Sequence, residues 1–96
     1  MNWYVLLYDY VANVEELRTP FREKHLELVN RHASKGEITQ AGAWKNPVDG
    51  AAFIFKCADR TIPESFVQAD PYVENGIVTA WKIKEWTVVA GSTVQK

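Results

Sequence analysis

The chain has 96 residues, of which 47% are hydrophobic and 24% are charged, and its formal net charge at pH 7 is −1. This size and composition indicate one globular domain with a modest core, and the near-neutral charge argues against nucleic acid or an anionic membrane as the main partner. Because Cys57 is the single cysteine, an internal disulfide is excluded and a reducing, cytoplasmic compartment is expected. Neither a leader pattern nor an apolar run near the roughly 18 residues of a membrane span is found.

The first half of the chain predicts a strand and then a helix. Residues 3–8 are aromatic and aliphatic without clean alternation, which indicates a strand covered on both faces. Residues 13–18 are ambiguous, because Asn13 and Glu16 resemble a capping box that Thr19-Pro20 then interrupts. We expect Thr19 to cap a helix that starts at Pro20 and ends at Lys35-Gly36.

The second half predicts two strands, a helix and a last strand. A strand is expected over 37–44, with Ile38, Gln40, Gly42 and Trp44 on one face, followed by a hairpin loop over 45–50. The remaining expected elements are a strand at 51–57 that is apolar on both faces, a helix at 63–69, a helical turn at 72–75 opened by Asp70-Pro71, and a long strand at 77–89. The domain is expected to cover residues 1–89, and 90–96 to form a polar, frayed tail.

The predicted order βαββαβ is that of a ferredoxin-like α+β sandwich. Two helices cover only one face of a four-stranded sheet, yet the strands at 3–8 and 51–57 are apolar on both faces. The second face therefore needs another cover, most simply the same face of a second copy. We expect a homodimer that forms through the open sheet face and encloses a barrel-like core.

His25 and Asp70 are the candidate catalytic residues. His25 falls on the apolar stripe of the first helix with Phe21, Leu28 and His32, where an unpaired imidazole would cost about 1–3 kcal/mol. If the fold brings Asp70 to it, the carboxylate would orient the ring for general acid/base chemistry. The blander alternatives are an Asp70 that only caps a helix and a His25 bonded to a backbone carbonyl.

Five further residues are candidates for contacting a small ligand. Arg22 precedes His25 by one turn and would hold an anionic group, and Tyr72 would donate its hydroxyl; the alternatives are a solvated arginine and an aromatic plug. Tyr8, Trp44 and Phe53 would line an aromatic pocket or belong to the core or a dimer interface. His25 and His32 with one carboxylate make a poor metal signature, so we assign no metal.

Several segments resemble the YCII-related (YciI-like) family. They are Arg22-Glu23-Lys24-His25-Leu26, Gly36, Ala41-Gly42, Ala69-Asp70-Pro71-Tyr72-Val73 and Gly76, and the resemblance spans about residues 3–86. It implies a ferredoxin-like fold, a dimeric α+β barrel and a pocket with a His–Asp pair, here His25 and Asp70. Wider relatives in that superfamily act on small, often aromatic or lactone compounds without a metal or organic cofactor.

Three functions therefore compete. The leading hypothesis is a small enzyme of the lyase or isomerase type that needs no cofactor and uses His25 and Asp70 on a small aromatic or cyclic compound. The second is a non-catalytic module that binds or senses a small molecule in the same pocket. The third is RNA binding, because residues 49–55 echo an RNA-recognition strand, but Asp49 replaces its basic residue and Ala51 a stacking aromatic.

Overall fold

The computed structural model describes residues 1–91 and has the predicted βαββαβ order. Its elements are β1 (Asn2–Tyr10), α1 (Val14–Leu17), the 3-10 helix η1 (Thr19–Phe21), α2 (Arg22–Ser34), β2 (Ile38–Ala43), β3 (Gly50–Cys57), α3 (Thr61–Ala69), α4 (Pro71–Glu74) and β4 (Val78–Trp86). The strands form one antiparallel sheet in the order β2-β3-β1-β4. This is the ferredoxin-like α+β architecture, as the sequence predicted. Within the described part of the chain, no helix is long and apolar enough to cross a membrane.

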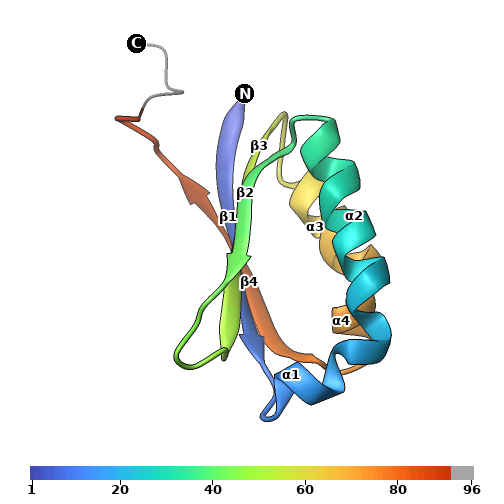
Figure 1. The fold of residues 1–96 in the computed structure, drawn as a ribbon. Coiled ribbons are helices and arrows are strands. Elements are labelled where there is room, and N and C mark those ends of the chain that lie inside the picture. Colours follow the sequence, from blue (N-terminus) through green and yellow to red (C-terminus); the bar gives the residue numbers. More distant parts are fainter. Residues whose placement is uncertain (92–96) are drawn as a thin grey trace.

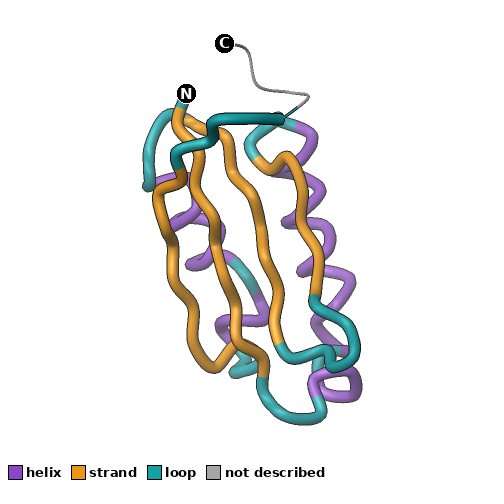
Figure 2. Tube along the Cα trace, turned by 90° about the vertical axis from the view of Figure 1, so that its left-hand side faces the viewer, coloured by secondary structure: helices purple, strands orange, loops and turns teal. Residues whose placement is uncertain are grey.

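The helices of residues 1–91 all lie on one face of the sheet, and the other face carries no helix from this part of the chain (Figures 1 and 2). The alternation of each strand decides which side chains meet the helices. On the helix side the core contains Tyr4, Leu6 and Tyr8 from β1, Ala51, Phe53, Phe55 and Cys57 from β3, and Phe66 and Val67 from α3. On the uncovered face, Val5, Leu7 and Ile54 are only half-buried.

The start of α2 differs from the prediction. Thr19 and Pro20 lie in η1, and α2 begins at Arg22. The Thr19 hydroxyl donates to the Glu15 carbonyl oxygen, 3.1 Å away, and caps no helix. The ambiguous residues before it form the short helix α1, but Asn13 makes no side-chain cap. The helix end was correct, because Gly36 takes the left-handed conformation at φ 77°.

Strand β2 contains a bulge that overturns the predicted single face of Ile38, Gln40, Gly42 and Trp44. Ile38 pairs with Phe55 but Gln40 pairs with Ile54, so the register shifts between them. One extra residue on one strand moves every later side chain to the opposite face. As a result Ile38 shares a face with Phe55, and Gln40 and Gly42 share the uncovered face with Ile54.

The last helices and strand also have different bounds from those predicted. Helix α3 begins at Thr61, two residues early, and Pro63 still lies in its first turn, where a missing N–H costs no hydrogen bond. Strand β4 ends at Trp86 instead of residue 89, and its last pair is Trp86 with Trp3, near the start of β1. Of the polar tail predicted over residues 90–96, Ala90 and Gly91 are exposed and belong to no helix or strand, and 92–96 lie outside the described residues.

Candidate functional site

The fold brings His25 and Asp70 together. His25, in α2, has its Nδ1 2.8 Å from Oδ1 of Asp70, which lies between α3 and α4. His25 is 5% exposed and Asp70 is fully buried. Asp70 takes its place because it also begins α4: its Oδ1 accepts the backbone N–H of Tyr72 at 3.0 Å, as a helix cap does. Capping and pairing with histidine therefore both occur.

The hydrogen bonds of Asp70 fix how the imidazole is protonated. Its Oδ2 accepts the hydroxyl of Tyr8 at 2.6 Å, and its Oδ1 receives the Tyr72 N–H and His25 Nδ1. A carboxylate has only acceptors, so we assign the His25 proton to Nδ1. The other ring nitrogen, Nε2, has no hydrogen-bond partner among residues 1–91 and is not sealed from solvent. Nε2 is therefore free to exchange a proton with a ligand.

Aromatic rings hold the imidazole in place. Tyr72 stacks on His25 with ring centroids 3.8 Å apart and planes 5° from parallel. Phe53 and Phe66 approach the same imidazole edge-on, at 6.1 and 6.5 Å. With its Nδ1 bonded, Tyr72 stacked on its ring and two phenylalanines against it, the histidine is held in one orientation, which a general acid/base needs.

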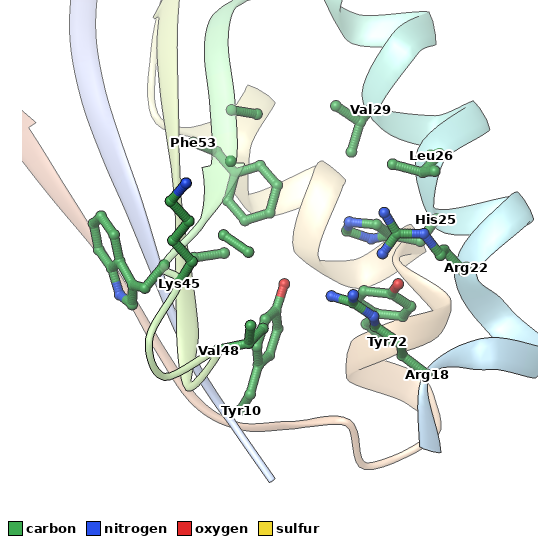
Figure 3. A pocket seen from close by; sticks show the side chains of 15 residues that line it. Tyr10, Arg18, Arg22, His25, Leu26, Val29, Lys45, Val48, Phe53 and Tyr72 are labelled. Atoms are coloured by element: carbon green, nitrogen blue, oxygen red, sulfur yellow. The ribbon is translucent and has the colours of Figure 1, made fainter. Parts of the chain in front are cut away.

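His25 forms part of the wall of a cavity of about 320 Å³ between α2 and the sheet. This volume is at the lower end of the range for small-molecule sites. In Figure 3, Arg18, Arg22, His25 and Tyr72 lie on one side of the cavity and Phe53, Val48 and Lys45 on the other, with the Tyr10 hydroxyl between them. Leu26 and Val29 of α2 add apolar contacts. The lining thus combines an apolar floor with a few polar groups.

The tyrosines around the site are neutral at physiological pH. Burial, and then the neighbouring Asp70 carboxylate, raise the pKa of Tyr8 far above its ordinary value. Burial raises the pKa of Tyr10 to about 12. Burial also raises the pKa of Tyr72, against the opposing charges of Arg22 and Arg18. Each of these phenols therefore keeps a proton that it can donate.

Four of the five predicted ligand contacts lie at the cavity. Arg22, Trp44, Phe53 and Tyr72 all belong to its lining. Trp44 is at the rim, because its half-exposed indole also reaches the uncovered sheet face beside Leu7 and Lys82. Tyr8 takes a different position: it is 1% exposed and lies behind Asp70 instead of at the lining. Its hydroxyl donates to the Asp70 carboxylate.

Sequence reasoning missed three polar residues of the cavity, namely Tyr10, Arg18 and Lys45. Tyr10 alternates with Tyr8 along β1, so the period of two could have placed it on the same face. Arg18 fell in the ambiguous segment before Thr19, and Lys45 in a hairpin loop, where periodicity gives no direction. No sequence signal located these two.

His32 belongs to a separate contact. Its Nδ1 lies 2.8 Å from Oε1 of Glu37, just after the end of α2, and its ring packs edge-on against Phe66. It shares no hydrogen-bond partner with His25. Across residues 1–91, no three His, Cys, Asp or Glu side chains gather into a possible metal site.

Solved structures confirm the fold at low sequence identity. A 5-chloro-2-hydroxyhydroquinone dehydrochlorinase, TftG from Burkholderia phenoliruptrix AC1100, is 17% identical with a TM-score of 0.75, over 88% of this chain and 93% of that one. Atu4242 from Agrobacterium tumefaciens is 14% identical with a TM-score of 0.65, over 99% and 100%. An uncharacterized NIPSNAP domain protein from Burkholderia xenovorans is 12% identical with a TM-score of 0.56, over the full length of both chains.

A search of curated proteins finds no match to the chain. The sequence model of the YCII-related domain, by contrast, matches residues 1–87, which include every described residue of the cavity and of the His25–Asp70 contact. The fold and the residues that first suggested this resemblance agree with that match, and the chain belongs to the YCII-related family.

Proposed function

We propose that this protein is a small enzyme that works without a cofactor, using His25 and Asp70 for general acid/base chemistry on a small aromatic or cyclic compound. The observation that carries the proposal is the contact at 2.8 Å between His25 Nδ1 and a fully buried carboxylate, with Nε2 left free at a cavity. A histidine oriented in this way has one nitrogen for its partner and one for the substrate.

The proposed chemistry is an elimination or an isomerisation. Nε2 accepts a proton from the substrate, and the electron pair of that bond forms a new π bond. In an elimination, the leaving group departs with its own bonding pair; in an isomerisation, the imidazolium returns the proton to another atom of the same molecule. Asp70 acts as a positioning residue, and its negative charge stabilises the imidazolium that forms.

The cavity supports a single-ring substrate. Its volume of about 320 Å³ suits a molecule of this size, and Phe53 and Tyr72 offer aromatic contacts. The structural neighbour TftG is a dehydrochlorinase of 5-chloro-2-hydroxyhydroquinone. At 17% identity this is an analogy between folds, but it makes halogenated and hydroxylated quinols the first compounds to try.

The test is turnover of such compounds, beginning with 5-chloro-2-hydroxyhydroquinone and chloride release. Replacing His25→Ala should lower kcat/KM by about 10²- to 10⁴-fold, and added imidazole should restore part of the rate. Asp70→Asn should cause a loss of similar order in a folded protein, because the amide oxygen can still face His25 and Tyr72 while its nitrogen donates to the Tyr8 hydroxyl oxygen.

A spectroscopic readout separates catalysis from structure. In ¹⁵N NMR, His25 of the unaltered protein should carry its proton on Nδ1 when neutral. Asp70→Asn should keep this tautomer, because the amide oxygen still accepts from Nδ1, so a loss of rate in that variant reports the missing negative charge. The opposite result would be a compound that binds in the cavity and is recovered unchanged, with His25→Ala altering only its affinity. That outcome would replace the enzyme with a module that binds or senses a small molecule.

We also propose that the protein acts as a homodimer through the uncovered face of its sheet. Trp3, Val5 and Leu7 of β1 and Ile54 of β3 point to this face and are half-buried in the single chain. These side chains lie on the two central strands, so a second sheet stacked on them would cover a continuous apolar surface.

A further inference from the structure

Positive charge gathers at the cavity although the chain as a whole carries a net charge of −1. Arg18, Arg22 and Lys45 all line it, from both sides (Figure 3). Among the described residues that line it, none is an aspartate or a glutamate. Among the described residues, the ion pairs involve other groups, so no carboxylate neutralises these three cations. Unneutralised cations around a small cavity favour a ligand of negative charge.

A second observation points to a ligand oxygen at the same place. Tyr72 is 1% exposed, and its hydroxyl is the one buried side-chain polar atom without a hydrogen-bond partner in the described part of the chain. A buried group left unpaired is costly and calls for an explanation. Tyr72 lines the cavity and its hydroxyl oxygen is sealed from solvent, so a ligand oxygen in the cavity meets this need when the side chains around the hydroxyl move aside.

The arginines decide which way the Tyr72 hydroxyl acts. The Arg22 guanidinium approaches the Tyr72 hydroxyl oxygen without completing a hydrogen bond of good geometry. The charges of Arg22 and Arg18 lower the pKa of Tyr72 against the effect of burial. A guanidinium has donors only, so its approach to the hydroxyl oxygen leaves the hydroxyl proton free for another acceptor. In Figure 3 the Tyr10 hydroxyl also points into the cavity, and with a pKa of about 12 it remains a donor. The two arginines and the two tyrosine hydroxyls thus all offer hydrogen to an acceptor, and His25 Nε2 is left as the proton acceptor.

From this geometry we infer that the substrate is a small planar anion, and that Arg22, Arg18 and the Tyr72 hydroxyl bind its charged oxygen. This inference rests on the proposed function for the reaction, but the anion site is built from residues other than His25 and Asp70. Tyr72 stacks on His25, so an oxygen bound to the Tyr72 hydroxyl brings the ring attached to it close to Nε2. The anion is a carboxylate or an ionised ring hydroxyl, since either supplies the same acceptor.

The experiment measures binding and not turnover. The Trp44 indole at the cavity supplies a fluorescence signal. The probes are two anions, 2,5-dihydroxybenzoquinone and benzoate, and two neutral counterparts of similar shape, 2,5-dimethoxybenzoquinone and benzamide. At least one anion should bind about 10-fold more tightly than its counterpart. The one with the larger preference identifies the charged group as a ring oxygen or a carboxylate.

The variants assign the site. Arg22→Gln and Arg18→Gln should each raise the dissociation constant of the preferred anion by about 10-fold. The dissociation constant of its neutral counterpart should not change. Tyr72→Phe should weaken binding of the anion, although the phenylalanine ring can still stack on His25. The matched control is Arg31→Gln, which removes the same charge from the same helix at an exposed position outside the cavity; it should change nothing. Circular dichroism verifies that each variant is folded.

The inference is overturned if neither anion is preferred over its neutral counterpart, or if Arg22→Gln and Arg31→Gln have the same effect. The experiments test the anion site independently of the proposed reaction. His25→Ala should lower kcat/KM by about 10²- to 10⁴-fold but keep the preference for the anion. A protein that prefers the anion and turns nothing over would retain this site and lose the proposed enzyme function.

Discussion

Asp70 connects three elements through one carboxylate. It begins α4, bonds His25 of α2 and accepts the Tyr8 hydroxyl of β1. A fully buried carboxylate is tolerated only when its acceptors are satisfied, and here donors from all three sides satisfy them. The position of the histidine is therefore coupled to the packing of the sheet against both helices.

Tyr8→Phe tests this coupling at the level of one hydroxyl. Removing the Tyr8 hydroxyl leaves Asp70 Oδ2 without its donor, so the free energy of unfolding should fall by about 1–3 kcal/mol. Urea denaturation measures the change. The matched control is Tyr4→Phe, at a buried position on the same face of the same strand, whose hydroxyl makes no hydrogen bond to a described residue. If both variants lower the free energy of unfolding by the same small amount, the hydrogen bond from Tyr8 to Asp70 does not stabilise the fold.

The sequence indicated His25 and Asp70 because each breaks a local pattern. A histidine on an apolar stripe and an Asp-Pro before a helical turn are visible without knowing the fold. Tyr8 and Arg18 show no such break, since an aromatic residue suits a core strand and an arginine suits a loop. Their place depends on which segments pack together, and that is information from the tertiary structure.

Strand β3 begins at Gly50, where the backbone lies very close to β1 and to the Trp44 indole. A Cβ at this position would overlap the backbone oxygen of Tyr8 and lie 3.0 Å from the Trp44 indole. Because a backbone atom of β1 cannot yield without disturbing the sheet, Gly50→Ala should lower the free energy of unfolding by about 1–3 kcal/mol. Thermal denaturation measures it. Gly42→Ala is the control, since nothing lies within 4 Å of the added Cβ; similar losses in both would contradict this explanation.

The elements themselves were predicted in type and order but not in every boundary. Alternation and capping residues suffice to find a strand or a helix, because both are local properties. The bulge between Ile38 and Gln40 is a property of the pairing with β3, and the end of β4 at Trp86 is set by where β1 begins. The residues of β2 or β4 alone do not indicate which strand each one pairs with, so they do not predict the bulge or the strand end.

The whole molecule should lose stability in alkali. Burial raises the pKa of Tyr10 to about 12, from 10.0. A group whose pKa is higher in the folded state stabilises that state fully below the unfolded pKa, and this contribution is lost as the pH rises through the folded pKa. Urea denaturation between pH 9 and 12 should therefore show stability falling above pH 10. Tyr10→Phe should reduce the fall; an unchanged slope in that variant would contradict the role of Tyr10.

The uncovered face of the sheet has an apolar centre and a charged edge. Trp3, Val5, Leu7 and Ile54 share this face on the central strands, and Lys82 and Lys84 share it on the edge strand β4. Lysines on an edge strand discourage edge-to-edge pairing of sheets. The apolar centre and charged edge therefore favour face-to-face stacking of two sheets, with the lysines at the rim of the interface.

Light scattering at micromolar concentration should give the mass of two chains. Leu7→Glu places a charge at the centre of the stacked faces, so the dissociation constant of the dimer should rise by at least about 10-fold. Leu17→Glu is the control, because Leu17 is 47% exposed and lies on α1, on the helix side of the sheet and not on the uncovered face (Figure 1); its dimer should persist. A monomer at these concentrations, or equal dissociation in both variants, would rule out this interface. Since the rim residue Trp44 faces both the cavity and the uncovered sheet face, its fluorescence should change on dissociation of the dimer as well as on ligand binding.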